Sequence, residues 1–242
     1  MNAYESCCMQ EITGETLRPG GFTLTQKAIN FCKLTREHNV LDLGCGRGAS
    51  IEYLHKEYQI RAVGIDASKQ LLQTAKAKNP YAQIIFAKAD ALPFFGGSFQ
   101  AVFAECTLSL MDNLDEVLNE AYRVLRLNGW FIISDVYAKN PKALHKLKNF
   151  SLNSCLRGLH DLTLLQEELE KRGFEVLLLE DYSHFLKELM VKIIFSHGSM
   201  SSFWGKTMVE PNQLCCSFEE SLRECKPGYF MVIARKRGDK NG

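Results

Sequence analysis

Three closely spaced glycines follow a short apolar run that contains one acidic residue. The run covers residues 40–43 with Asp42 inside it, and Gly44, Gly46 and Gly48 come directly after it. A strand that turns sharply into a helix brings backbone N–H groups to a ligand, and glycine lets that ligand lie against the backbone. This spacing predicts a site for a nucleotide-type cofactor.

Two classes of cofactor fit such a turn. Gly44-x-Gly46-x-x-Ala49 satisfies the relaxed dinucleotide fingerprint, in which alanine replaces the third glycine. Asp66 ends a second predicted strand, where a carboxylate would accept the ribose hydroxyls of either cofactor. Asp42, however, lies two residues before the first glycine, where it would repel a pyrophosphate and attract an ammonium group. Asp42 therefore favours a cofactor that carries an amino group.

Further motifs follow the glycine turn in a fixed order. They are Asp90-Ala91-Leu92-Pro93-Phe94, Ser98-Phe99-Gln100-Ala101-Val102 and Glu120-Ala121-Tyr122-Arg123-Val124-Leu125. Over residues 38–136 this order resembles the class I S-adenosylmethionine-dependent methyltransferases, specifically the small-molecule group with a short D-x-L-P-F loop.

That resemblance implies roles for individual residues. Asp42 would lie near the methionine moiety of S-adenosylmethionine, Asp66 would hold the ribose, and Asp90 with Ala91 would recognise the adenine edge. The remaining residues expected at this cofactor site are Gly44, Cys45, Gly46, Ala67 and Glu105.

The rest of the chain alternates predicted strands and helices. After strands at 40–43 and 61–66, further strands are predicted at 84–87, 101–104, 130–134, 175–180 and 229–234. Ser68, Asn113 and Thr163 are expected to begin helices, and an earlier helix is expected to bury Leu24, Ala28, Ile29 and Phe31. Repeated β-α-β units predict an α/β fold with a doubly wound, seven-stranded, mostly parallel sheet. The resemblance adds that the last strand is antiparallel.

Domain organisation follows from that pattern. We expect residues 1–242 to form a single methyltransferase domain, with residues 1–36 as an N-terminal cap segment. Within this cap, residues 18–22 would either fold over the methionine end of the cofactor or form a helix-entry turn. Residues 183–228 form an insert before the last strand that is too long for a hairpin, and long inserts of this kind often act as lids.

We expect the residues that select the methyl acceptor to lie at the carboxyl ends of the central strands. The segments there are Glu105-Cys106-Thr107-Leu108-Ser109-Leu110, Ser134-Asp135-Val136-Tyr137 and, further on, Ser154-Cys155-Leu156-Arg157-Gly158. Together they resemble the arsenite methyltransferases, which implies that Cys106 and Cys155 hold a thiophilic acceptor as low-pKa thiolates. Such a soft nucleophile needs no base, and Glu105 completes the predicted catalytic set.

The other cysteines have simpler interpretations. Cys32 and Cys45 are predicted to pack as small apolar residues. The vicinal pairs Cys7-Cys8 and Cys215-Cys216 receive no role, and no Cys-x-x-Cys pair suggests a metal site.

Composition limits the partners. The net charge of +1 and the pI of about 7.5 disfavour nucleic acid, and neither a signal peptide nor a membrane span is recognisable. We therefore predict a cytoplasmic enzyme with a small-molecule substrate, no membrane partner and an unspecified oligomeric state. Two alternatives stay open: a nicotinamide-dependent oxidoreductase, and a non-catalytic protein that binds the adenosyl ligand and senses a metalloid.

Overall fold

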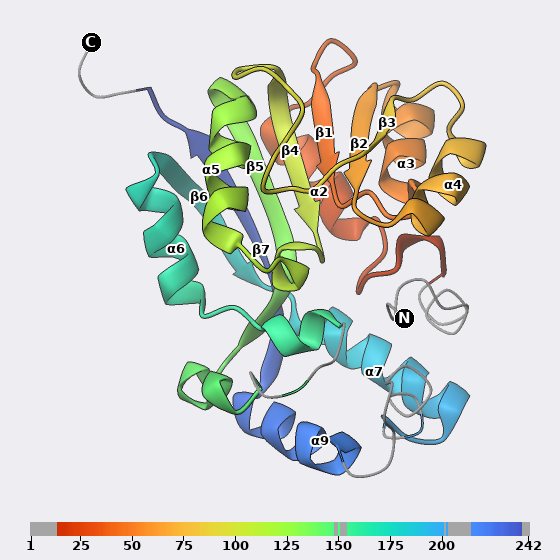
Figure 1. Cartoon of the computed structure of the whole chain (residues 1–242), viewed down its shortest axis with the longest axis vertical. Coiled ribbons are helices and arrows are strands. Elements are labelled where there is room, and N and C mark those ends of the chain that lie inside the picture. Colours follow the sequence, from red (N-terminus) through yellow and green to blue (C-terminus); the bar gives the residue numbers. More distant parts are fainter. Residues whose placement is uncertain (1–13, 148–149, 151–153, 201, 203–213, 239–242) are drawn as a thin grey trace.

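A seven-stranded sheet forms the centre of the molecule (Figure 1). The computed structural model describes residues 14–147, 150, 154–200, 202 and 214–238. The strands are β1 (Val40–Leu43), β2 (Ala62–Asp66), β3 (Ile84–Phe86), β4 (Phe99–Glu105), β5 (Leu125–Ala138), β6 (Phe174–Asp181) and β7 (Pro227–Lys236), in the order β3-β2-β1-β4-β5-β7-β6. Neighbouring strands are parallel except at β7, which runs antiparallel to both β5 and β6. The predicted fold class is confirmed, including the antiparallel last strand.

Helices cover both faces of this sheet. On one face, α2 (Thr23–Cys32), α3 (Ala49–Tyr58) and α4 (Lys69–Lys78) bury their apolar side chains in a shared core. On the other face, α5 (Leu114–Val124) and α6 (Leu162–Lys171) pack into a second core (Figure 1). Two short 3₁₀ helices, η3 (Leu108–Leu110) and η5 (Cys155–Gly158), lie beyond the carboxyl ends of β4 and β5.

Of the three predicted helix N-caps, the structure has two at the predicted residue and one at a different residue. Ser68 and Asn113 cap α4 and α5 as predicted, each accepting a hydrogen bond from the backbone N–H three residues further on. Helix α6 begins after Asp161, whose carboxylate accepts from the N–H groups of Thr163 and Leu164. The prediction that Thr163 begins this helix is therefore wrong, because the acidic residue two positions earlier is a strong N-cap.

Helix α2 buries a slightly different face from the predicted one. Leu24, Ala28 and Ile29 are buried, but Phe31 is 40% exposed and Cys32 only 6%. Positions 28, 29 and 32 lie on one side of a helix with 3.6 residues per turn, and position 31 lies off that side. The prediction for Phe31 is wrong, and Cys32 takes the inward position.

The described part of the insert between β6 and β7 includes the helices α7 (Ser183–His197) and α9 (Leu214–Cys225). Both lie at the end of the molecule toward which the parallel strands point (Figure 1). Helix α9 was not predicted from the sequence, although Phe218, Leu222 and Cys225 are buried at helical spacing. Among the described residues, no helix is long and apolar enough to cross a lipid bilayer.

Candidate functional site

A cavity of about 560 Å³ opens at the carboxyl ends of β1, β2 and β4. Ligands bind at this place in doubly wound sheets, because the winding direction reverses there. The predicted residues that line it are Asp42, Gly44, Cys45, Gly46, Asp66, Ala67, Asp90, Glu105 and Cys106. Ala91 and Cys155 do not line it, and the N–H of Ala91 donates to the carbonyl oxygen of Lys88.

The glycine turn forms one wall of the cavity. Gly44, Gly46 and Gly48 all have positive φ angles of 78°, 52° and 78°. A Cβ on Gly44 would lie 2.1 Å from the hydroxyl oxygen of Thr107, whereas one on Gly46 would meet only Leu17, at 4.0 Å. A side chain at Gly46 would therefore fill space that the backbone leaves open to a ligand.

Backbone N–H groups of the turn are directed into the protein. Those of Gly44 and Cys45 donate to the carbonyl oxygen of Ile65, and that of Gly46 donates to the Asp66 carboxylate at 2.9 Å. The expectation that these N–H groups face a ligand is wrong. The turn supplies close approach, but these three N–H groups are not available to a ligand.

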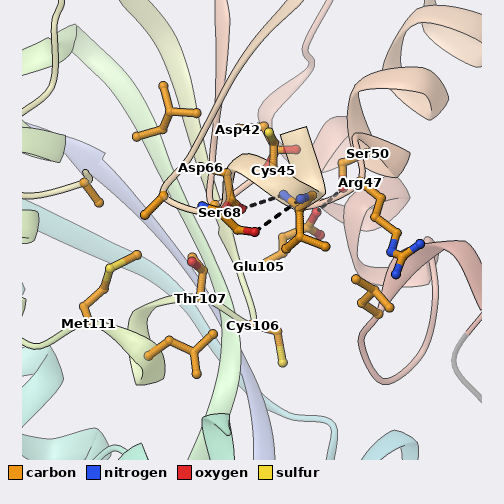
Figure 2. Close-up of a pocket in the computed structure, with 18 of the residues that line it drawn as sticks. Asp42, Cys45, Arg47, Ser50, Asp66, Ser68, Glu105, Cys106, Thr107 and Met111 are labelled. Atoms are coloured by element: carbon orange, nitrogen blue, oxygen red, sulfur yellow. Dashed lines mark hydrogen bonds between the residues drawn. The ribbon is translucent and has the colours of Figure 1, made fainter. Parts of the chain in front are cut away.

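Asp66 is held at the end of β2 by two backbone donors. Its Oδ2 accepts from Gly46 and its Oδ1 accepts from the N–H of Ser68 at 2.7 Å (Figure 2). Each carboxylate oxygen can accept more than one hydrogen bond. Asp66 is thus fixed in direction and suited to accept ribose hydroxyls.

Asp42 is the buried polar group that most clearly calls for a ligand. It is 2% exposed, and its Oδ2 has no hydrogen-bond partner among the described residues. Burial, followed by the nearby negative charge of Glu105, raises the pKa of Asp42 to about 7. A cationic donor would satisfy both the unpaired oxygen and the charge, so the ammonium group of S-adenosylmethionine fits this position.

Glu105 is already engaged by the protein. Its Oε1 accepts from the hydroxyl of Thr25 at 2.7 Å, and its Oε2 lies 3.1 Å from the donating hydroxyl of Ser50 and 3.0 Å from Nη2 of Arg18. A carboxylate whose lone pairs are occupied in this way is poorly placed to take a proton from a substrate. The geometry gives Glu105 the task of holding Arg18 at the cavity wall.

The loop that carries Asp90 is clamped from α5. Glu120 accepts a hydrogen bond from the N–H of Leu92 at 2.6 Å, and Arg123 donates to the carbonyl oxygens of Leu92 and Phe94. Arg123 also pairs with Glu120. This pair explains why the motifs at residues 90–94 and 120–125 occur together, since the second holds the first in place.

Cys106 and Cys155 are brought together from distant parts of the chain. Cys106 lies at the end of β4 and Cys155 in η5, and the two thiols are near enough for Cys155 to influence the pKa of Cys106. A Cβ on Gly158 would lie 1.9 Å from the carbonyl oxygen of Ser109, so only glycine lets η5 approach η3 this closely. The contact with Cys155, together with burial, raises the pKa of Cys106, and the expected low-pKa environment is wrong for this thiol.

Near Cys106 lies a buried polar pair of Asp135, from a segment that the sequence singled out, and His160, which was not anticipated. Asp135 is fully buried and accepts from the N–H and hydroxyl of Ser109 and from the N–H of Val136. His160 places its Nε2 3.6 Å from this carboxylate. No local motif marks His160, because only the pairing of its backbone with Tyr137 brings it to the end of β5.

The remaining cysteines add no further site. Cys32 and Cys45 are buried, as the packing interpretation requires, and burial raises the pKa of Cys32 to about 12. Cys7 and Cys8 lie outside the described residues, as do the side chains of Cys215 and Cys216. No group of three or more metal-ligating side chains is found in the part of the chain that the structure describes.

Comparison with known proteins agrees with this geometry. The family described as "Methyltransferase domain" matches residues 41–133. The O-methyltransferase cnsE of Penicillium expansum is 33% identical over 230 residues, covering 92% of this chain and 80% of the relative. Methyltransferase GfsG of Streptomyces halstedii is 27% identical over 178 residues, covering 70% of this chain and 64% of the relative.

A solved structure shares the fold. It is phosphoethanolamine N-methyltransferase 2 of Haemonchus contortus, bound to phosphomonomethylethanolamine and S-adenosylhomocysteine, with a TM-score of 0.73 and 18% identity. The alignment covers 96% of this chain but 57% of that one, and GfsG is likewise spanned over less than two thirds of its length.

Fold, site and relatives together define the class of protein. The chain belongs to the class I methyltransferases, and its cofactor is S-adenosylmethionine. The nicotinamide-dependent alternative is not supported, as the orphaned carboxylate of Asp42 already indicated.

Proposed function

We propose that this chain methylates a small, thiophilic acceptor of the arsenite type, held by Cys106 and Cys155. The observation that carries the proposal is that the close approach of η5 to η3 brings the two thiols near each other. Cys106 lines the cofactor cavity, and Cys155 supplies a second soft ligand directly beside it. Two thiols at this separation suit a soft centre that binds sulfur in preference to oxygen.

Binding of such an acceptor balances without an oxidant. Each thiol proton would combine with one hydroxyl of arsenous acid and leave as water, while one sulfur–arsenic bond forms at each cysteine. Because the pKa of Cys106 is raised, this thiol holds its proton until the acceptor displaces it. Since each thiol proton leaves within a water molecule, no net proton is released, and binding should not depend on pH while both thiols are protonated.

Two groups that commonly act as a base, a histidine and a free Glu105, are not offered to the acceptor. The described residues that line it include no histidine, and the carboxylate of Glu105 is engaged by Arg18, Thr25 and Ser50. When bound, the cofactor supplies an electrophilic methyl group, and a soft lone pair can attack it without losing a proton. A hydroxyl or a protonated amine, by contrast, would need a base to remove its proton.

Oxygen and nitrogen acceptors are the competing hypotheses. The printed names of cnsE and of the Haemonchus enzyme describe O- and N-methylation. A panel of arsenite, thiols, phenols and amines, assayed for transfer of a labelled methyl group, would discriminate among them. Turnover of arsenite alone would support the proposal, whereas turnover of phenols or amines would overturn it. The absence of any turnover would favour the non-catalytic, metalloid-sensing alternative.

A cysteine series tests the thiol pair directly. The background carries serine at the four vicinal cysteines, Cys7, Cys8, Cys215 and Cys216, so that they cannot bind arsenite. We expect Cys106→Ser and Cys155→Ser each to weaken arsenite binding by about tenfold or more in calorimetry, because one soft bond is lost. The buried Cys32→Ser is the matched control and should bind arsenite as the parent does. Equal binding by all three variants would contradict the proposal.

A further inference from the structure

Arg18 is a buried cation at the wall of the cofactor cavity. It is 7% exposed and lies in the N-terminal segment, far in sequence from the strands that form the site. Its Nε donates to the carbonyl oxygen of Gly21, its Nη1 to Ser50 at 2.9 Å, and its Nη2 to Thr25 at 2.7 Å. Nη2 also pairs with Glu105 at 3.0 Å.

These contacts close into a ring of hydrogen bonds. Thr25 and Ser50 each accept from Arg18 and donate to Glu105. Such a network fixes the guanidinium in one orientation. Since a buried ion pair contributes little net stability compared with apolar packing, the fixed orientation suggests a task in binding.

One N–H donor of Arg18 is not used by this ring of hydrogen bonds. A guanidinium has five N–H groups, and the contacts above use one on Nε, one on Nη1 and two on Nη2. The second N–H of Nη1 has no partner among the described residues. Arg18 and Asp42 line the same cavity, and Arg18 is close enough to lower the pKa of Asp42.

We propose that Arg18 binds the carboxylate of the methionine end of S-adenosylmethionine, while Asp42 binds its ammonium group. The two side chains would then match the two opposite charges of the amino-acid moiety. The glycine turn cannot serve the carboxylate through Gly44, Cys45 or Gly46, because their N–H groups are bonded within the protein.

The other cations of the cavity wall are less well placed. Arg47 extends from the turn away from Asp42 in Figure 2. Lys88 lies after β3, two residues before Asp90, on the side expected for the adenine. Arg18 is thus the lining cation that stands beside the orphaned carboxylate.

A purely structural Arg18 would behave differently from a ligand-binding one. If Arg18 only anchored the N-terminal segment, its loss would weaken every adenosyl ligand by a similar factor. If it binds the carboxylate, its loss should weaken only ligands that carry a carboxylate. The discriminating pair is S-adenosylmethionine and decarboxylated S-adenosylmethionine, which both keep the ammonium and sulfonium groups.

Calorimetry of both ligands tests the assignment. The double variant Arg18→Gln/Glu105→Gln removes both charges of the pair, so no unpaired buried charge is left behind. We expect it to lose about tenfold or more affinity for S-adenosylmethionine, as for a lost charge-assisted hydrogen bond, and to change by less than about threefold for the decarboxylated ligand. Equal losses for the two ligands would overturn the proposal.

Two further variants keep the test informative. Arg18→Lys retains a positive charge and should lose part of the preference for the carboxylate, because an ammonium cannot reproduce the fixed fork of the guanidinium. Asp42→Asn should weaken both ligands equally, since both carry the ammonium group. Misfolded molecules would bind neither ligand. The ratio of the two affinities therefore reflects only the folded molecules, and partial misfolding does not change it. An unchanged ratio in Arg18→Lys, together with an unchanged ratio in the double variant, would assign Arg18 to the fold alone.

Discussion

Three carboxylates around one cavity differ because of their partners. Asp66 is fixed by two backbone N–H groups, and Glu105 is neutralised by Arg18. Asp42 is the most deeply buried of the three, and one of its oxygens has no hydrogen-bond partner among the described residues. All three side chains carry a carboxylate, so the ligand-binding task of Asp42 follows from its unpaired oxygen and its burial.

The raised pKa of Asp42 predicts a pH-dependent affinity for the cofactor. The pKa is about 7 in the folded protein, above its ordinary value of 3.8, mainly because of burial. An ammonium group binds the ionised form, so below about pH 7 binding must release a proton and affinity should fall by up to about tenfold per pH unit. Above this pH the affinity should level off. Calorimetry of S-adenosylhomocysteine in two buffers of different ionisation enthalpy measures the released proton.

The same shift has a consequence for stability. Between about pH 4 and 7 the folded chain holds a proton that the unfolded chain has lost, so the free energy of unfolding should decrease as pH rises through this window. Asp42→Asn should remove this slope and unfold at a higher temperature at pH 8, yet bind the cofactor at least about tenfold more weakly. A cofactor affinity in Asp42→Asn that matches the parent would contradict the assigned contact.

At the scale of elements, a loop and a short 3₁₀ helix of the site are positioned by neighbouring elements. The loop from Asp90 to Phe94 is held by Glu120 and Arg123 of α5. In a similar way, Gly158 lets η5 approach η3 and so brings one thiol to the other. Each site segment therefore depends on contacts with an element from another part of the chain.

The clamp on the Asp90 loop predicts an effect on cofactor binding. Arg123→Met should remove the hydrogen bonds to two loop carbonyl oxygens and loosen the loop, lowering affinity for S-adenosylhomocysteine by about three- to tenfold with a modest loss of stability. Arg126→Met is the matched control, because Arg126 donates only to the carbonyl oxygen of Gly97. Binding calorimetry and thermal unfolding of both variants provide the measurement. Equal affinities in the two variants would show that the clamp does not serve the site.

The sequence predicts those parts of the fold and site that depend on short local motifs or on the order of strands in the sheet. The glycine turn, Asp66 and Asp90 each follow a predicted strand, and parallel strands bring their carboxyl ends to one edge. The role of Arg18 and the position of His160 depend on partners far along the chain, such as Glu105 for Arg18. No sequence period encodes such contacts, so only the folded chain reveals them.

At the scale of the whole molecule, the N-terminal segment lies between the cavity and the insert. Arg18 reaches Glu105 on one side, while a Cβ on Gly20 would lie 2.7 Å from the ring of Phe185 in α7 on the other. Lys27 of α2 also pairs with Glu180 and donates to Tyr182 just before α7. We propose on this basis that the cap and the insert act together as a cover for the site within one domain.

Phe185 tests this coupling. Phe185→Ala should remove the ring that packs against the backbone of Gly20, so residues 17–22 should exchange their amide hydrogens faster and the cofactor affinity should fall by about three- to tenfold. Phe195→Ala is the matched control on the same helix, because Phe195 is 87% exposed. In the parent, S-adenosylhomocysteine should slow exchange in residues 17–22 and in α7 together, if one contact joins them. Protection of residues 17–22 without any change in α7, or unchanged exchange there in Phe185→Ala, would separate the insert from the site and leave the cap to act by itself.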